Sequence, residues 1–177
     1  MKTNTNGNAY VRDCMLQALL TLMDEKAFQE ISICDITRRA NVSRMAYYRN
    51  YSSKEEILTS HLEGVLHQYV KFTRPKSTGK VHINKKNIAK LFEFCKEQQQ
   101  FLQRCDNAGL GYYFLDAITA YLLRYFMREG DGKEREYILN AYASALCSTV
   151  VKWLRSGTVE SAEQMAEMIY KIYSPYV

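Results

Sequence analysis

Helical periodicity runs through most of this 177-residue chain, and few residues interrupt it. Proline is the residue that most strongly ends a helix, yet only Pro75 and Pro175 occur. Apolar residues recur at intervals of three and four positions, and few segments show the strict alternation of a half-buried strand. The pattern therefore predicts an all-α fold whose helix ends are set by capping residues and turns.

Residues 32–58 predict two short helices joined by a tight turn. Ser32 and Asp35 form the S-x-x-D pattern of a helix N-terminus. Asn41 tolerates the left-handed backbone that ends such a helix, and Ser43 can accept hydrogen bonds from the free N–H groups of the next helix. The turn is therefore about as short as two packed helices allow.

The second helix of this pair, residues 44–51, carries two arginines and three tyrosines but almost no aliphatic side chain. A helix of that composition is suited to face a charged surface. A helix, a short turn and a basic, aromatic helix form the helix-turn-helix pattern, whose second helix enters the DNA major groove. A further helix is expected to begin at Lys54, because Ser53 and Glu56 form a capping box.

This segment resembles the DNA-binding domain of the TetR family of bacterial repressors. The positions that carry the resemblance are in register without a gap: Ile36, Ala40, Val42, Ser43, Tyr48, Tyr51, Lys54 and Leu58. The resemblance implies a three-helix helix-turn-helix domain at residues 1–53, which binds DNA. It also implies a helical ligand-sensing and dimerisation domain at residues 54–177, in which residues 54–72 form a connecting helix.

DNA binding needs phosphate contacts, which fix position, and base contacts, which specify sequence. Matching positions in the family contact the DNA backbone, so the resemblance implies phosphate contacts from Tyr48 and from Lys54 with the helix N-terminus there, supported by Ser43. Arginine pairs with guanine, and an apolar side chain touches the thymine methyl group. The candidates for base contacts lie on or near the exposed face of the second helix: Arg44, Met45, Tyr47 and Arg49.

Several residues in this segment also have a structural interpretation. Tyr51 stands where the family packs an aromatic side chain into its core, so it is assigned to packing. Arg38 and Arg39 are expected on a solvated helix face or near phosphates. The alternative for Arg49 is a surface residue without a partner.

The charge and the cysteines narrow the class of protein. The net charge is +5 and the pI is about 8.9, which favours a polyanionic partner without establishing one. The five cysteines are scattered without a C-x-x-C pair and are expected to be free thiols in a reducing cytosol. The N-terminus lacks the apolar run of a signal peptide, and no uncharged stretch reaches the roughly 20 residues that span a bilayer. We therefore expect a cytoplasmic protein without membrane contact.

Beyond residue 70 the sequence predicts a charged loop followed by four helices. Residues 71–80 hold four cations, no acid, a proline and a glycine. This segment is either a solvated connector or a second contact to DNA phosphates. The helices are expected at about residues 84–105, 112–128, 134–156 and 161–173.

Aromatic side chains are concentrated in residues 112–126. Such a composition suits a ligand cavity, but it suits a core or a dimer seam equally well. The candidate pocket residues are Cys95, Tyr113, Tyr121, Tyr125 and Tyr142.

The last two predicted helices are apolar on more than one face, which favours a subunit interface. The candidate interface residues are Ala145, Val150, Trp153, Met165, Ala166 and Ile169. Trp153-Leu154, Gly157 and residues 161–168 are also similar to the C-terminal helices of a TetR subgroup common in low-GC Gram-positive bacteria.

Catalysis has no support in the sequence. The three histidines lack H-x-x-x-H spacing, and neither a glycine-rich phosphate loop nor a G-x-S-x-G motif occurs, so we expect no catalytic residue, metal or cofactor. The leading hypothesis is a homodimeric transcriptional regulator that binds double-stranded DNA at a near-palindromic operator and is a repressor relieved by a small-molecule effector. The alternative is an effector-free co-regulator or activator whose C-terminal domain binds a partner protein.

Overall fold

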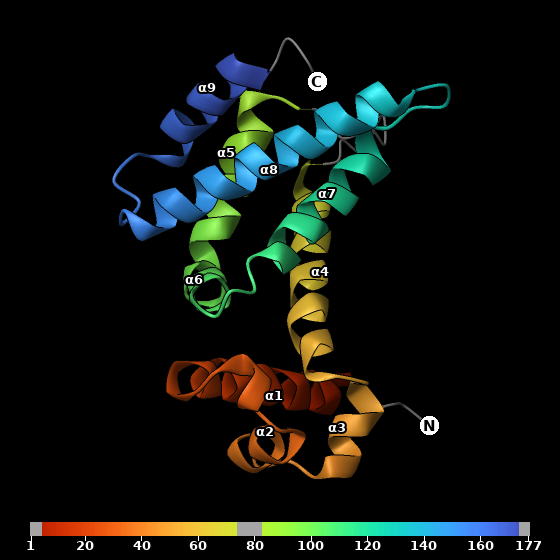
Figure 1. Cartoon of the computed structure of the whole chain (residues 1–177), viewed down its shortest axis with the longest axis vertical. Coiled ribbons are helices and arrows are strands. Elements are labelled where there is room, and N and C mark those ends of the chain that lie inside the picture. The colour runs from red at the N-terminus through yellow and green to blue at the C-terminus, as the bar shows by residue number, and fades with distance from the viewer. Residues whose placement is uncertain (1–4, 74–82, 174–177) are drawn as a thin grey trace. The chain divides into compact units, whose positions relative to one another are not determined.

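The computed structural model describes residues 5–73 and 83–173, and all regular structure within these ranges is helical (Figure 1). The helices in chain order are α1 Thr5–Glu25, η1 Phe28–Glu30, α2 Ile33–Arg39, α3 Arg44–Asn50, α4 Lys54–Thr73, α5 Lys85–Glu97, α6 Gln99–Asn107, α7 Tyr112–Phe126, α8 Lys133–Arg155 and α9 Ala162–Tyr173. The all-α prediction is confirmed. Most of the predicted charged loop, residues 74–80, lies outside the described residues. None of the helices described is long and apolar enough to cross a membrane.

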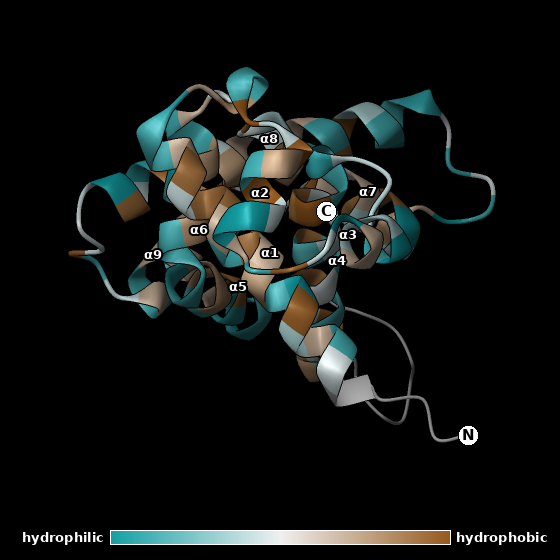
Figure 2. Cartoon of the chain, turned by 90° about the horizontal axis from the view of Figure 1, so that it is seen from below, coloured by the Kyte–Doolittle hydropathy of each residue, from teal (hydrophilic) through white to brown (hydrophobic). Residues whose placement is uncertain are grey.

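The chain forms two compact units, residues 1–61 and 62–177. Figure 2 shows hydrophobic and hydrophilic residues in alternating bands along the helices, as expected of amphipathic helices. The division predicted from the sequence, after residue 53, coincides with the start of α4, whereas the boundary between the units falls inside that helix.

In the N-terminal unit, α1 packs against α2 and α3 around a small apolar core. Fully buried side chains from these helices and from the start of α4 meet there, among them Met15, Leu19, Ile36, Tyr47 and Leu58.

The predicted helix ends of α2 and α3 are confirmed. The Ser32 hydroxyl accepts from the Asp35 N–H at 3.1 Å, and the Asp35 carboxylate accepts from the Ser32 N–H at 3.0 Å. Asn41 adopts the left-handed conformation with φ 52°, and Ser43 caps α3 by accepting from the Ala46 N–H at 3.0 Å. These caps fix the turn between the two helices.

In the C-terminal unit, α7 packs beside α8 and α9 packs along α5 (Figure 1). The rings of Phe92 and Trp153 pack edge to face, with 5.2 Å between their centres. The Trp153 indole N–H donates to the Glu160 carbonyl at 3.0 Å. An ion pair of 2.5 Å between Lys85 and Glu167 also joins α5 to α9. The apolar stripe of α9 is therefore covered by helices of the same chain.

This packing corrects the prediction for the subunit interface. Five of the six candidates are buried inside the single chain, so their side chains are not available to a second copy: Val150, Trp153, Met165, Ala166 and Ile169. The sixth, Ala145, is half-buried. Apolar residues on two faces of α8 and on α9 indicate a helix covered by neighbours, and in this chain α5, α6 and α7 supply the cover.

Candidate nucleic-acid interface

Helix α3 presents a polar and aromatic face to solvent. Met45 is 85% exposed and Tyr48 is 62% exposed, and they lie three residues apart on one face. Arg44, Arg49 and the capping residue Ser43 are exposed beside them. The structure thus places five of the predicted DNA-binding residues on one accessible surface, which we name the α3 face: Ser43, Arg44, Met45, Tyr48 and Arg49.

Tyr47 does not belong to the α3 face, and the prediction that it lies on or near the exposed side is wrong. Its side chain is 0% exposed. The centre of its ring lies 5.3 Å from that of Tyr48 and 6.2 Å from that of Tyr51. Burial raises the pKa of Tyr47 to about 12. The spacing contained the signal, because Tyr47 precedes the core residue Tyr51 by four positions and so shares its face.

Lys54 also differs from its predicted role. Its ammonium donates to the carbonyl oxygens of Phe28 at 2.6 Å, Gln29 at 3.2 Å and Ile31 at 2.9 Å. An ammonium has three N–H donors, so these carbonyls engage all of them and leave none for a phosphate. Its partners lie 23 to 26 residues earlier in the chain, so no local sequence pattern could have revealed them.

The first turn of α4 is also less suited to a phosphate than expected. Glu55 and Glu56 lie in that turn, and the Glu56 carboxylate accepts from the Ser52 N–H at 2.6 Å. The Ser53 hydroxyl accepts from the Glu56 N–H at 3.2 Å. The helix N-terminus therefore already has negative partners within the protein.

Most cations around α2 are paired with carboxylates. Arg39 forms two hydrogen bonds of 2.8 Å to Glu25, and Lys26 approaches Asp35 at 2.8 Å. In the described part of the chain, by contrast, no carboxylate forms an ion pair with Arg44 or Arg49. These two guanidinium groups on the α3 face are available to an external anion or to a guanine.

One thiol lies beside the α3 face. Hydrogen bonding to the guanidinium groups of Arg44 and then Arg38 lowers the pKa of Cys34, and the Arg38 Nη2 to Cys34 Sγ distance is 3.9 Å. Cys34 is half-buried on α2. The sequence predicts Cys34 only as a free thiol, and its place next to Arg44 follows from the packing of α2 against α3.

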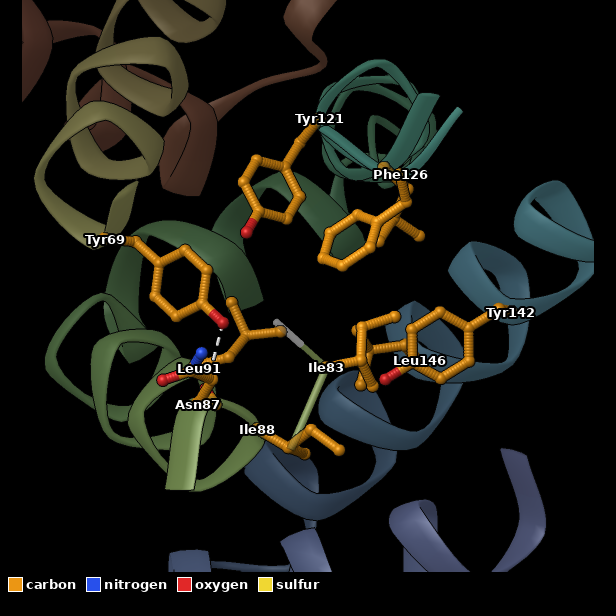
Figure 3. A pocket seen from close by; sticks show the side chains of 10 residues that line it. Tyr69, Ile83, Asn87, Ile88, Leu91, Tyr121, Phe126, Tyr142 and Leu146 are labelled. Atoms are coloured by element: carbon orange, nitrogen blue, oxygen red, sulfur yellow. Dashed lines mark hydrogen bonds between the residues drawn. The ribbon is translucent and has the colours of Figure 1, made fainter. Parts of the chain in front are cut away.

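A small cavity lies in the C-terminal unit between α4, α5, α7 and α8 (Figure 3). Its volume of about 20 Å³ is enough for one water molecule. The described residues that line it are uncharged: Tyr69, Ile83, Asn87, Ile88, Leu91, Tyr121, Leu122, Phe126, Tyr142 and Leu146. The Tyr69 hydroxyl donates to the Asn87 carbonyl at 2.9 Å across one side of the cavity.

Two of the five predicted pocket residues, Tyr121 and Tyr142, line this cavity. Tyr113 instead lines a second, smaller cavity of about 10 Å³, while Cys95 and Tyr125 line neither. These two cavities thus take up three of the five residues, and a ligand pocket formed by all five stays a prediction.

The Tyr121 hydroxyl is the notable polar group of the cavity. It is buried, and within the described residues it makes no hydrogen bond of good geometry, although the Tyr69 and Thr73 hydroxyls lie nearest. Burial raises its pKa well above the usual tyrosine value. A neutral hydroxyl in this position can donate to a guest molecule. Among the described residues, no cluster of histidine, cysteine and carboxylate side chains is arranged to hold a metal ion.

Several solved structures share the fold of this chain, and some of them are named as transcriptional regulators. The protein Lin0861 from Listeria innocua aligns over 97% of this chain and 93% of its own, with 18% identity and a TM-score of 0.74. A TetR transcriptional regulator from Streptococcus agalactiae aligns over 94% and 95%, with 18% identity and a TM-score of 0.61. The dihydroxyacetone kinase operon activator DhaS aligns over 92% and 93%, with 19% identity and a TM-score of 0.54. Identities this low establish a common fold alone.

Family models cover most of the sequence itself. Residues 15–60 match the model for bacterial regulatory proteins of the tetR family, and residues 84–174 match a transcriptional regulator C-terminal region. No curated protein matches the sequence. Proteins of this family are DNA-binding transcription factors and not enzymes. The two matches together with the helix-turn-helix at α2 and α3 show that the chain belongs to the TetR family of transcriptional regulators.

Proposed function

We propose that this regulator binds a near-palindromic operator as a homodimer in the cytoplasm and represses transcription until an effector releases it. The observation that carries the DNA-binding part is the α3 face. Two exposed guanidinium groups without a carboxylate partner among the described residues, an exposed thioether and an exposed phenol lie there on one short helix. In a helix-turn-helix protein this is the surface that enters the major groove.

The residues of the α3 face divide into two roles. Tyr48 and Ser43 carry hydroxyls suited to donate to phosphate oxygens and so to fix the position of the helix. Arg44 and Arg49 are suited to guanine, and Met45 to a thymine methyl group. Tyr47 and Tyr51 support this face from the core and contact no DNA.

The experiment is a selection of bound duplexes from a random library, followed by titration of the selected operator and a scrambled duplex. Arg44→Ala should lower operator affinity by about 1–3 kcal/mol and relax the preference at one position. Tyr48→Phe should weaken both duplexes by similar factors, because a phosphate contact carries no sequence information. A wild-type protein without preference for any duplex would contradict the proposal.

The homodimer is proposed to form through the exposed side of α8, in place of the buried residues predicted from the sequence. This side carries small residues that allow close helix approach, with one tyrosine at its end: Tyr137, Ala141, Ser144 and Ser148. Two copies related by a two-fold axis could then present their α3 helices to major grooves about 34–36 Å apart.

We expect repression that a bound effector relieves. The cavity in the C-terminal unit must enlarge to admit an effector molecule. A guest larger than water has to displace side chains that line the cavity, and it would then meet the Tyr121 hydroxyl. A structural neighbour is an operon activator, and the small cavity favours a second candidate function, an activator or co-regulator whose C-terminal unit binds a partner protein. Transcript levels in a deletion strain decide the direction, because loss of a repressor raises adjacent transcripts and loss of an activator lowers them.

A further inference from the structure

Lys54 is held inside the N-terminal unit more firmly than any other lysine described there. Its three donors meet three carbonyl oxygens at 2.6, 2.9 and 3.2 Å, and its ammonium lies 4.6 Å from the centre of the Phe28 ring. An aromatic face and converging carbonyl dipoles both attract a cation. The site is therefore a small cation cage that the protein fills with its own side chain.

The cage is built from the connection between α1 and α2. Its carbonyls belong to η1 and to Ile31, the residue that follows it. Within η1 the Glu30 N–H donates to the Ala27 carbonyl at 2.9 Å, and the Ile31 N–H donates to Phe28 at 3.2 Å. Because this single turn is short, Lys54 supplies hydrogen bonds that a longer helix would supply itself.

Lys54 also lies directly beyond the recognition helix. Helix α3 ends at Asn50, and residues 51–53 alone separate it from α4. Tyr51, its C-terminal cap, is bound to α1 because the Arg12 Nε donates to the tyrosine hydroxyl at 3.1 Å. The other end of α3 is fixed by the Ser43 cap and by the hydrogen bond from the Val42 N–H to the Thr37 carbonyl at 3.0 Å. Lys54 completes the attachment of the C-terminal end.

We propose that Lys54 is a positioning residue: its ammonium binds the exit of α3 to the connection between α1 and α2, sets the orientation of the α3 face, and makes no phosphate contact. This inference rests on the proposed DNA-binding function. It differs from the phosphate contact that the family resemblance implied for the same residue.

The two roles make opposite predictions for Lys54→Met and Lys54→Arg, measured on the selected operator and on a scrambled duplex over a range of salt concentrations. A positioning role predicts that Lys54→Met loses about tenfold or more in operator affinity, as for a lost charged hydrogen bond, and much less on the scrambled duplex. Its salt dependence stays unchanged. Lys54→Arg should also lose operator affinity, because a planar guanidinium cannot direct its donors at three converging carbonyls.

A phosphate contact predicts the reverse pattern. Lys54→Met would then weaken both duplexes equally and lower the slope of log affinity against log salt by about one unit. Lys54→Arg would bind like the wild type, because arginine keeps the charge. Either result overturns the inference, as does an unchanged operator affinity of Lys54→Met.

Lys96→Met is the matched control, since it removes one cation at an exposed position of α5, in the C-terminal unit. It should keep the operator preference. Binding is measured at a temperature at which circular dichroism shows each variant fully folded, so lost affinity does not reflect unfolding. If Lys54→Met does not fold, Lys54→Arg alone decides between the two roles. A wild-type protein without operator preference would contradict the proposed function itself, a result distinct from failure of the Lys54 inference.

Discussion

At the scale of single residues, two neighbouring tyrosines of the helix-turn-helix are buried with different polar surroundings. The Tyr51 hydroxyl accepts a hydrogen bond from Arg12 at 3.1 Å. The Tyr47 hydroxyl is buried without a hydrogen-bond partner among the described residues. A buried hydroxyl that has lost its water and gained no partner destabilises the folded state.

Replacing each tyrosine by phenylalanine should therefore have opposite effects. Tyr47→Phe removes an unsatisfied hydroxyl and should raise the free energy of unfolding by about 1 kcal/mol. Tyr51→Phe breaks the bond to Arg12 and should lower it by about 1 kcal/mol. Urea unfolding followed by circular dichroism measures both, and a loss of stability in Tyr47→Phe would show that its hydroxyl has a favourable role.

Cys34 offers a chemical probe of the α3 face. Its pKa is lowered by Arg44 and Arg38, whereas burial raises the pKa of Cys105 and of Cys147 to about 12. Thiolate is the reactive form, so a disulfide reagent at pH 7 should modify Cys34 well before the buried thiols.

Bound operator DNA should slow the modification of Cys34, because a base in contact with Arg44 also covers the neighbouring thiol. Cys34→Ser identifies the fast phase by its disappearance. Equal modification rates with and without bound operator would place the DNA away from the N-terminal end of α3.

At the scale of elements, the start of α2 depends on one carboxylate. Asp35 accepts hydrogen bonds from Lys26 at 2.8 Å and from the Ser32 hydroxyl at 2.7 Å and N–H at 3.0 Å. These interactions, with Lys26 first, hold its pKa well below the usual range. A lowered pKa in the folded state means that the stabilisation is present above the unfolded pKa of about 4 and is lost as the pH falls below it.

Asp35→Asn should therefore unfold at lower urea concentration than the wild type at pH 7, and the difference should shrink progressively below about pH 4. Asp116→Asn, on the exposed side of α7, is the control and should leave the urea midpoint unchanged at each pH. A difference between wild type and Asp35→Asn that persists undiminished at pH 2.5 would show that the amide disturbs the cap by its shape.

At the scale of the whole molecule, the C-terminal unit buries α9 on α5 and leaves a side of α8 exposed. A charge inside the unit and a charge on that side should have different consequences. Ala166 is 1% exposed, so Ala166→Arg buries an unpaired charge and should unfold the unit. Ser144→Arg lies on the exposed side of α8 and should leave the fold intact while converting the dimer to monomers.

Sedimentation velocity and circular dichroism together distinguish these outcomes. Gln100→Arg, an exposed position on α6, is the control and should remain a folded dimer. If Ser144→Arg sediments as an unaltered dimer, the proposed α8 interface is wrong, and the exposed side of α7 becomes the next candidate.

Local features of this protein could be predicted because their causes act over three or four residues. Ser32 with Asp35, and Ser43 with the N–H group three positions later, form their hydrogen bonds where the pattern indicated. Asn41 takes the left-handed conformation that a short polar side chain tolerates. The all-α fold and the family could be predicted for the same reason, because helix caps, turns and apolar stripes depend on residues that are close together in the sequence.

The partners of each apolar or charged group depended on contacts between distant parts of the chain. An apolar stripe shows that a helix face is covered, but not by which helix, so Met165 and Ile169 appeared free for a second copy although α5 covers them. Lys54 looked available for a phosphate, although carbonyls 23 to 26 residues away hold its ammonium. Hydrophobic burial is non-directional, and a long side chain reaches several ångströms. Only the packing of the helices in three dimensions therefore determines which helix covers an apolar stripe and which group binds a charged side chain.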